Sequence, residues 1–277
     1  MLTALQTCFA ACGRTLSLTS LSYGPDASRD PARANEVNVG GTETLIAVMA
    51  GAGRAMSLLV SGSAEVYGRP RPEDLPLTET AATMPTHAYG RSKLAQERAA
   101  LGAAADHQIP VAVTRSFNHT GPGQRAEFVA PALARRVLDA RDRRTPGIRV
   151  GNVDVVRDFS DVRDVVRAYR LLLEGLANGA IGPAVVANVA TGRGVTIRWI
   201  LEVLCRLAGV DAEPIIDPAL VRPDDPAEII GDPSHLQRLT GWAPAIDLER
   251  TLADLLEDVE SSRANDASEF RRPRSTA

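Results

Sequence analysis

The chain has 277 residues, which is enough for one large domain or two small ones with a sizeable core. The 31 lysines and arginines nearly balance the 34 aspartates and glutamates, so the formal net charge is only −3. Proteins that bind nucleic acids or membrane surfaces neutralise phosphates with an excess of basic residues, and this chain has no such excess. We therefore expect neither kind of partner, whereas a small anionic ligand would need only a few arginines.

The cysteines and the apolar segments favour a cytoplasmic protein. Cys8, Cys12 and Cys205 are odd in number and lack the spacing of a metal site, which suits a reducing compartment better than a disulfide scaffold. No apolar run approaches the ~20 residues of a membrane span. Residues 1–22 lack the basic and apolar parts of a signal peptide. We expect no metal site and no membrane contact.

The N-terminal region lacks a phosphate-binding turn. Residues 1–22 predict a short helix and then a strand. A Rossmann-type dinucleotide site needs a first strand, a glycine-rich turn that lets the backbone approach the pyrophosphate, and a ribose-binding residue about 20 positions later. None of these precedes Ser63. Gly51 and Gly53 follow a helix predicted over 36–50, so they are more simply its C-cap.

Three residues form a predicted acid/base site. The short apolar run 57–60 is typical of a buried strand, and it delivers Ser63 to the carboxyl edge of a sheet, where open α/β sheets place their ligands. After the proline-rich loop 69–88 a helical pattern begins, which places Tyr89 and Lys93 one turn apart on the same side. A nearby ammonium favours the ionised form of a phenol, so Lys93 would lower the pKa of Tyr89. Ser63 could then hydrogen-bond the same substrate oxygen.

Two segments carry a resemblance to a known family. Residues 61–68 (SGSAEVYG) and 89–93 (YGRSK) resemble the extended short-chain dehydrogenase/reductases of the NAD-dependent epimerase/dehydratase family, which act on nucleotide-activated sugars. The resemblance covers roughly residues 22–258. It implies NADP or NAD as the cofactor, contacted by Tyr89 and Lys93. It also implies a homodimer that uses the Tyr89 helix and the helix near 36–50.

A loop after the next predicted strand strengthens the resemblance. Residues 111–115 are a β-rich run, and the segment that follows, SFNHTGPGQ, is similar to one in the GDP-6-deoxymannose reductases of this family. That similarity implies that Asn118 contacts the substrate or the nicotinamide, with Phe117 on the cofactor side. For His119, a hydrogen-bonded loop histidine is the favoured interpretation, because Tyr89 already fills the acid role.

The second half of the chain is expected to hold the nucleotide. A helix is predicted over 127–140, and the resemblance places Val129 at the nucleotide. Arg157 is assigned to the diphosphate, because a guanidinium pairs bidentately with phosphate oxygens. The run RPDDP resembles a family element whose arginine and acid contact the GDP part, and these residues are Arg222 and Asp225.

Other polar residues and elements are expected to be structural. Residues 157–164 (RDFSDVRD) resemble a further signature of the family, and Asp158, Asp161 and Asp164 recur at helical spacing near a helix start, which favours capping. The remaining predicted elements are a strand at 184–190, a helix at 197–208 with Thr196 as N-cap, a helix start at Asp232 and Pro233, and a last helix at 248–260.

These observations predict an α/β fold. We expect a doubly wound parallel sheet, Rossmann-like but N-terminally truncated and lacking its first βαβ unit, with a smaller C-terminal substrate domain. Residues 1–120 would form the partial dinucleotide-binding domain, to which segments from about 148–195 return. Residues 121–260 would form mainly the substrate domain, and 261–277 a disordered tail.

The expected activity follows from the resemblance. It implies NAD(P)H-dependent reduction of a GDP-linked 6-deoxy-4-keto sugar, GDP-4-dehydro-6-deoxy-D-mannose, to GDP-D-rhamnose. Tyr89 would protonate the oxygen and Ser63 would orient the carbonyl. One alternative is a GDP-mannose 4,6-dehydratase, because Glu65 sits where related dehydratases carry a glutamate that removes a proton at C5. A second alternative is an inactive, truncated family member that only binds GDP-sugars.

Overall fold

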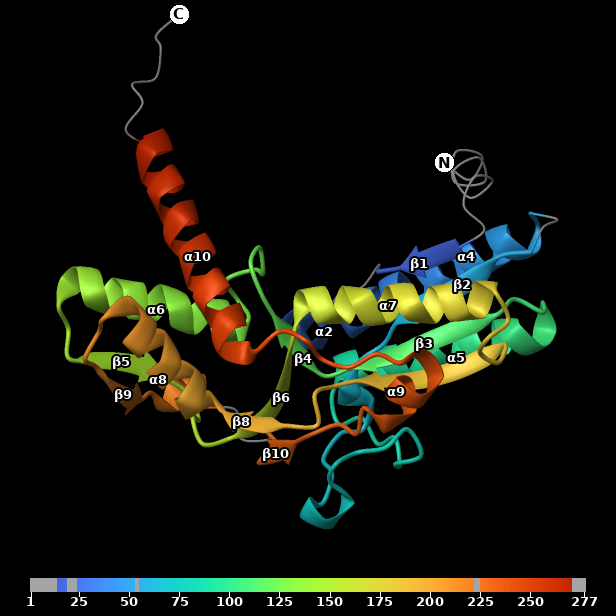
Figure 1. The fold of residues 1–277 in the computed structure, drawn as a ribbon, viewed down its shortest axis with the longest axis horizontal. Coiled ribbons are helices and arrows are strands. Elements are labelled where there is room, and N and C mark those ends of the chain that lie inside the picture. The colour runs from blue at the N-terminus through green and yellow to red at the C-terminus, as the bar shows by residue number, and fades with distance from the viewer. Residues whose placement is uncertain (1–13, 19–23, 53–54, 222–224, 271–277) are drawn as a thin grey trace, which may run out of the picture.

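A parallel sheet forms the larger of two lobes (Figure 1). The computed structural model describes residues 14–18, 24–52, 55–221 and 225–270. The four strands of this sheet lie in the order β1 (Arg14–Ser17), β2 (Ser57–Ser61), β3 (Val111–Ser116) and β7 (Ala184–Val189), and all their pairings are parallel. The predicted strand before Ser63 is therefore β2, near the middle of a parallel sheet.

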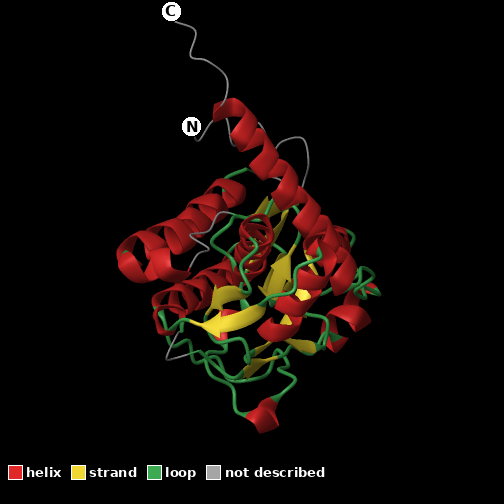
Figure 2. Ribbon diagram, turned by 90° about the vertical axis from the view of Figure 1, so that its left-hand side faces the viewer, coloured by secondary structure: helices red, strands yellow, loops and turns green. Residues whose placement is uncertain are grey.

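Helices cover both faces of the sheet, as Figure 2 also shows. Leu58 and Val60 of β2 pack against α4 (Gly41–Ala50) and α5 (Ala88–Asp106). Leu59, between them, points to the opposite face and packs against α7 (Val162–Ala177) and α9 (Ser234–Thr240). Alternate strand residues thus enter two different cores, which is why the strand sequence is continuously apolar. The prediction of a doubly wound, Rossmann-like parallel sheet is confirmed.

The region before α4 is more complex than the single helix predicted over 36–50. It contains α2 (Gly24–Arg29), α3 (Pro31–Asn35) and a π-helical turn (Glu36–Gly40), after which α4 continues. Asp30 caps α3 by accepting a hydrogen bond from Arg33 N–H at 2.9 Å. The π turn buries Asn38, whose amide donates to Ser92 Oγ at 2.9 Å. This amide ties the segment to the helix that carries Tyr89.

A second lobe is built around a short two-stranded sheet (Figure 1). Its strands are β5 (Gly147–Val150) and β9 (Glu213–Ile216), and its helices are α6 (Val129–Arg143), α8 (Ile197–Ala208) and α10 (Leu248–Phe270). Buried residues of these helices and of β5 share one apolar core. Thr196 is the N-cap of α8, as predicted, and accepts a hydrogen bond from Trp199 N–H at 3.0 Å.

Short strands and turns connect the two lobes. The strand β6 (Val156–Asp161) pairs with β4 (Asn118–Thr120), β8 (Gly194–Thr196) and β10 (Glu228–Ile229). Single 3-10 turns lie at Ala64–Val66, Pro72–Asp74 and Pro218–Leu220. Within the segment 148–195, β7 is a strand of the large sheet and α7 packs on that sheet, whereas β5 belongs to the second lobe. The residue boundaries given to the two domains stay a prediction.

The C-terminal helix extends further than the sequence predicted. We expected a disordered tail from 261, but α10 continues to Phe270. Arg263 binds Asp139 and Asp142 of α6, at 2.8 and 3.0 Å, and these contacts hold the helix beyond its predicted end. The start of that stretch is therefore helical, and residues 271–277 lie outside the described part.

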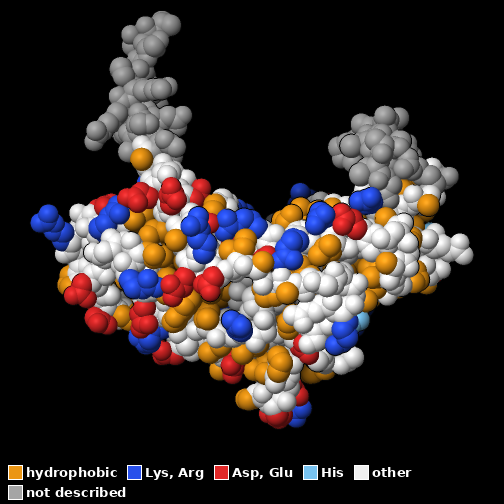
Figure 3. All heavy atoms as spheres, in the orientation of Figure 1, with side chains coloured by type: hydrophobic (Ala, Val, Ile, Leu, Met, Phe, Trp, Pro, Cys, Tyr) orange, Lys and Arg blue, Asp and Glu red, His pale blue; other side chains and the backbone are white. Residues whose placement is uncertain are grey.

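The surface agrees with the balanced charge of the sequence. On the face shown in Figure 3, acidic and basic side chains are interspersed over both lobes. Within residues 14–18, 24–52, 55–221 and 225–270, no helix has the length and apolar character needed to cross a bilayer.

Candidate active site

Ser63 lies directly after the carboxyl end of β2. It is 8% exposed, and its Oγ accepts a hydrogen bond from Glu65 N–H at 3.2 Å, which caps the short turn that follows. A Cβ atom at Gly62 would lie 2.2 Å from Thr114 O, so the chain can pass this close to β3 only with glycine. The strand end and the turn together fix where the serine hydroxyl lies.

The first turn of α5 is packed against the same loop. A Cβ atom at Gly90 would lie 2.6 Å from Glu65 O, so the helix backbone touches the residue two positions after Ser63. Tyr89 is half-buried in this turn. Ser92 Oγ donates to Tyr89 O at 2.8 Å and accepts from Asn38, which anchors the turn from below. The structure therefore brings the predicted serine loop and the predicted tyrosine helix together.

Lys93 lies one turn further along α5 and is 1% exposed. It is also the only lysine in the sequence. Its Nζ donates to Ser61 O at 2.6 Å and to Gln96 Oε1 at 2.7 Å, so the amine sits beneath the carboxyl end of β2. Burial lowers the pKa of Lys93 to about 7, because the interior disfavours the charged ammonium. Its influence on the Tyr89 phenol and its contact with the cofactor stay predictions.

Glu65 and His87 form a contact that the sequence did not predict. Glu65 Oε2 lies 2.8 Å from His87 Nε2, and the two side chains are 47% and 36% exposed. His87 is also the N-cap of α5, because its Nδ1 accepts from Gly90 N–H at 3.2 Å. Glu65, the candidate base of a dehydratase, is thus held at the N-terminus of α5.

The two residues of the next predicted loop have different environments. Phe117 is 3% exposed and packs in an apolar cluster with Tyr67, and its N–H donates to Val189 O at 3.0 Å. Asn118 begins β4 and is exposed. The contact of either residue with the cofactor stays a prediction, and of the two side chains only Asn118 is on the surface.

Two of the predicted nucleotide-binding residues meet in the structure. Arg157 on β6 is 7% exposed and forms a 2.6 Å ion pair with Asp225. A second guanidinium nitrogen, Nη1, donates to Val156 O at 2.7 Å. Val129 is the first residue of α6 and packs on the core of the second lobe. Arg222 lies outside the described residues.

Of the three signature aspartates, only Asp161 has the predicted capping role, whereas Asp158 lies on β6 and Asp164 lies within the first turn of α7, and each of these two binds backbone N–H groups of a distant loop. Asp161 caps α7 by accepting from Arg163 N–H at 2.7 Å, and Asp164 accepts from Ala245 N–H and Ile246 N–H at 2.8 and 2.9 Å. Asp158 accepts from Thr191 N–H at 2.8 Å and from Gly192 N–H at 2.9 Å. Burial raises the pKa of Asp158, and these hydrogen bonds oppose that effect.

A pocket of about 530 Å³ lies between β1 and α7, beside Ser61 at the carboxyl edge of the sheet. Its walls are mostly apolar, and Tyr169 and His119 also line it. The Tyr169 hydroxyl contacts Ser61 Oγ at 3.2 Å and Ser116 Oγ at 2.8 Å. His119 Nδ1 donates to Phe117 O at 3.1 Å, and burial lowers its pKa, which favours a neutral, hydrogen-bonded histidine. Sequence reasoning did not find Tyr169, because its partners lie 108 and 53 positions away.

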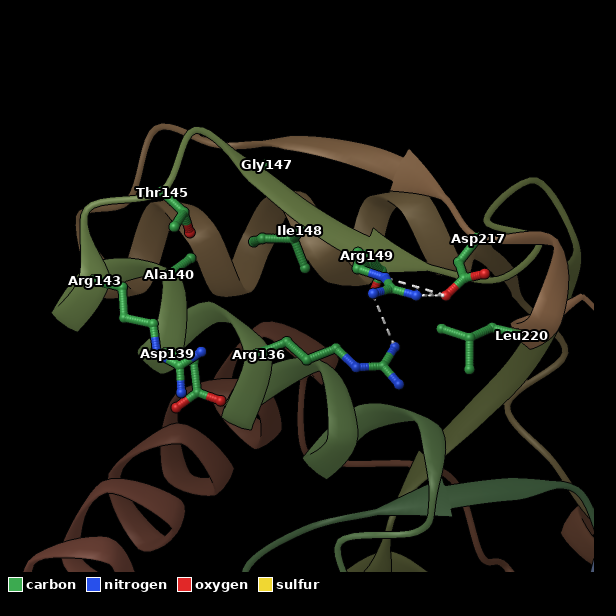
Figure 4. A pocket seen from close by; sticks show the side chains of 10 residues that line it. All are labelled: Arg136, Asp139, Ala140, Arg143, Thr145, Gly147, Ile148, Arg149, Asp217 and Leu220. Carbon is green, nitrogen blue, oxygen red and sulfur yellow. Dashed lines mark hydrogen bonds and ion pairs between the residues drawn. The ribbon is translucent and has the colours of Figure 1, made fainter.

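A second pocket, of about 460 Å³, is in the other lobe between α6 and the β5–β9 ladder (Figure 4). Arg149 pairs with Asp217, and Arg136 Nη1 donates to Arg149 O at 3.1 Å. The pairing with Arg149 lowers the pKa of Asp217. None of the site residues predicted from the sequence lines this pocket.

Fold and comparison together define the class of protein. A parallel sheet with helices on both faces, carrying a serine, a tyrosine and a lysine at its carboxyl edge, is the architecture of a Rossmann-like dehydrogenase/reductase. A profile of the family described as GDP-mannose 4,6 dehydratase matches residues 16–255. The chain belongs to this family, so it is related to enzymes that act on sugar nucleotides.

Individual relatives narrow the class. The chain is 36% identical over 247 residues to a GDP-6-deoxy-D-mannose reductase of Pseudomonas aeruginosa, covering 89% of this chain and 80% of that protein. The solved structure of RMD from Pseudomonas aeruginosa with NADPH is similar with a TM-score of 0.82 and 34% identity, covering 90% and 82% of the two chains. A Thermotoga maritima UDP-glucose 4-epimerase with UDP-glucose gives a TM-score of 0.83 at 26% identity, covering 95% and 82%. The family that the sequence motifs predicted is confirmed, and so is an NADP- or NAD-dependent class of enzyme, because similar structures hold NADPH or NAD.

Proposed function

We propose that this protein reduces the 4-keto group of GDP-4-dehydro-6-deoxy-D-mannose to give GDP-D-rhamnose. The observation that carries the reaction type is the packing of the Ser63 loop on the first turn of α5, because it sets Tyr89 beside that loop with Lys93 one turn below. The substrate is carried over from the P. aeruginosa reductase, which is 36% identical.

The chemistry requires one proton donor from the protein. NAD(P)H, when bound, supplies the hydride to C4 of the sugar. The Tyr89 phenol gives its proton to the C4 oxygen, so the ketone becomes an alcohol and the phenol is left as a phenolate. Ser63 Oγ donates a hydrogen bond to the same oxygen and orients it. Lys93, when protonated, stabilises the phenolate until solvent returns the proton.

The nicotinamide end of the cofactor is assigned to the carboxyl edge of the sheet. The pocket of about 530 Å³ opens there beside Ser61, whose carbonyl also holds Lys93, and its volume is in the range of small-molecule sites, although Ser63, Tyr89, Lys93 and Asn118 are not among the residues that line it. Tyr89, Lys93 and Asn118 would hold the nicotinamide and its ribose, with Phe117 forming the core behind them.

The nucleotide part of the substrate is assigned to the second lobe. The Arg157 guanidinium has five N–H donors. Its contacts with Asp225 and Val156 orient it and leave donors for the oxygens of a diphosphate. Asp225, Arg222 and Val129 would contact the remainder of the GDP. This assignment requires the sugar to lie between the lobes, with its C4 end at Tyr89.

The proposed reaction is tested by supplying two substrates separately. With NADPH and the 4-keto sugar, a reductase yields GDP-rhamnose, which chromatography and mass spectrometry identify. With GDP-mannose and NADP⁺, a GDP-mannose 4,6-dehydratase yields the 4-keto product instead. The position of Glu65 beside α5 favours keeping this second candidate. Binding of GDP-mannose without turnover of either substrate would indicate a chain that only binds GDP-sugars.

We also propose a homodimer and a cytoplasmic location. The dimer would use α5 and the helix near 36–50, as the resemblance implied. Equilibrium sedimentation tests the first proposal, because a dimer has twice the 29.4 kDa mass of one chain. Cell fractionation tests the second.

A further inference from the structure

The N-terminus of α5 carries a contact that the proposed reaction does not use. His87 Nδ1 accepts from Gly90 N–H at 3.2 Å, and Nε2 lies 2.8 Å from Glu65 Oε2. A backbone N–H can only donate, so Nδ1 must carry a lone pair. The proton of the neutral ring is therefore on Nε2 and is donated to the Glu65 carboxylate. The imidazole bridges two segments that are 22 positions apart in the sequence.

These contacts close a ring that includes both catalytic segments. Ser63 Oγ accepts from Glu65 N–H at 3.2 Å, the Glu65 side chain accepts from His87, and His87 caps Gly90. The ring closes where the Gly90 backbone packs on Glu65 O. Tyr89 directly precedes Gly90 in the sequence. This series of contacts therefore runs from the Ser63 hydroxyl to the residue next to Tyr89.

The histidine ring also faces the tyrosine ring. Their planes are parallel within 2°, and their centroids are 6.4 Å apart, which is within the range of interacting aromatic pairs. A ring held at both nitrogens cannot turn about its side-chain bonds without losing one hydrogen bond. The orientation of His87 is therefore fixed by Glu65 on one side and by the helix on the other.

Electrostatic strength does not explain this arrangement. The two side chains are 36% and 47% exposed, and contacts between such exposed groups contribute little to stability. The contact can act through geometry instead, because a proton donor must lie within hydrogen-bond distance of the oxygen that it protonates.

We propose that His87, held by Glu65, is a positioning residue that fixes Tyr89 relative to Ser63. This inference rests on the proposed reductase function. In this arrangement Glu65 acts through its acceptor oxygen and transfers no proton, so the chain keeps a carboxylate beside the site without using it as a base.

The test compares the kinetics of five variants with those of the wild-type chain. His87→Ala and Glu65→Ala should each lower kcat about 10-fold, or about 1.4 kcal/mol, with KM for the 4-keto sugar changed less than about 2-fold. The double variant should be no worse than either single one, because both remove the same link. Glu65→Gln keeps an acceptor oxygen and should stay within about 3-fold of the wild-type kcat. His87→Asn keeps a favourable N-cap but cannot bridge to Glu65, so it should recover thermal stability and not kcat.

Three results would overturn the inference. Full kcat in His87→Asn would mean that capping alone matters. Losses that multiply to about 100-fold in the double variant would mean that the residues act independently. A Glu65→Gln variant as slow as Glu65→Ala would mean that the carboxylate transfers a proton. His107→Ala, an exposed histidine at the other end of α5, serves as the matched control and should leave kcat unchanged.

A readout without substrate separates this inference from the proposed function. Hydrogen exchange at the Gly90 amide, measured by NMR on the ligand-free chain, reports the cap directly. Glu65→Ala should speed this exchange if the carboxylate holds the imidazole, and unchanged exchange would refute the link. A wild-type chain that reduces no keto sugar contradicts the proposed function, and the exchange result then decides the His87 inference alone.

Discussion

Replacing Lys93 by methionine should change how the stability of the protein depends on pH. Lys93 is 1% exposed, and burial lowers its pKa from 10.5 to about 7. Between these values the unfolded chain binds a proton that the folded chain has released, so the free energy of unfolding rises with pH. The difference between the two pKa values corresponds to a free energy of about 5 kcal/mol. This is an upper limit, because Ser61 O and Gln96 Oε1 accept hydrogen bonds from the charged ammonium and so oppose the lowering of its pKa.

Methionine has a similar length but carries no charge. Its introduction leaves Ser61 O and Gln96 Oε1 without their donor, which costs about 1–3 kcal/mol for each buried group at any pH. The stability of the wild type relative to Lys93→Met should therefore increase as the pH rises from about 6 to about 10, by up to about 5 kcal/mol. Other titrating groups are common to both chains and cancel in the difference.

Urea unfolding at several pH values measures this difference, with the fluorescence of Trp199 and Trp242 as the signal. Because Lys93 is the only lysine, a chain labelled with ¹³C-lysine gives one side-chain resonance whose titration reports the same pKa directly. Parallel stability curves for the two chains, or a resonance that titrates near 10.4, would refute the reasoning.

Three further predictions follow from particular contacts. Gly90→Ala should lower both stability and kcat, because the new Cβ would lie 2.6 Å from Glu65 O. As a control, Gly102→Ala in the same helix meets no atom closer than 4.0 Å and should raise the melting temperature slightly. Equal effects of the two substitutions in thermal melts and kinetics would contradict the packing. Arg115→Met should destabilise the protein by about 3–5 kcal/mol in urea titrations, because it leaves the Glu97 carboxylate, which is 5% exposed, without its 2.7 Å partner. Arg115→Met combined with Glu97→Leu should recover part of that loss. A double variant as unstable as the single one would argue against the ion pair. Arg157→Ala should weaken GDP binding at least about 10-fold, measured by calorimetry. The control Arg198→Ala removes an exposed ion pair with Asp154 and should leave GDP binding unchanged. Equal GDP affinities of the two variants would show that Arg157 is not the diphosphate ligand.

Local patterns were sufficient to predict the main elements of the site. The apolar run before Ser63 and the four-residue spacing from Tyr89 to Lys93 depend on neighbouring residues only, and the structure places them on β2 and α5 as expected. The capping roles of Asp161 and Thr196 were predictable for the same reason.

Contacts between distant segments could not be predicted in this way. The bond from Lys93 to Ser61 O joins residues 32 positions apart, and the bond from Tyr169 to Ser61 joins residues 108 apart. No periodicity in the sequence indicates such a pair, because its geometry depends on how the helices pack on the sheet. The ion pair between Arg157 and Asp225 is a similar case, since each residue was assigned to the ligand separately.

Errors at the ends of elements have a related cause. The sequence indicated one helix over 36–50, whereas the structure contains a π turn there that buries Asn38 against Ser92. The polar stretch after 261 looked unable to fold by its own composition. Its first residues are helical because Arg263 binds two aspartates of α6. In both places a tertiary contact outweighs the local preference.

The most direct test of the proposed function is the oxidation of NADPH by the 277-residue chain in the presence of GDP-4-dehydro-6-deoxy-D-mannose, measured side by side for the wild type and Tyr89→Phe. We expect the wild type to consume NADPH and form GDP-rhamnose. The variant should lose about 10²–10⁴-fold in kcat while binding the GDP-sugar as tightly, because only the proton donor is removed. Undiminished turnover by Tyr89→Phe would contradict the central assignment of the acid, and a wild type that leaves NADPH unoxidised would contradict the proposed reaction itself.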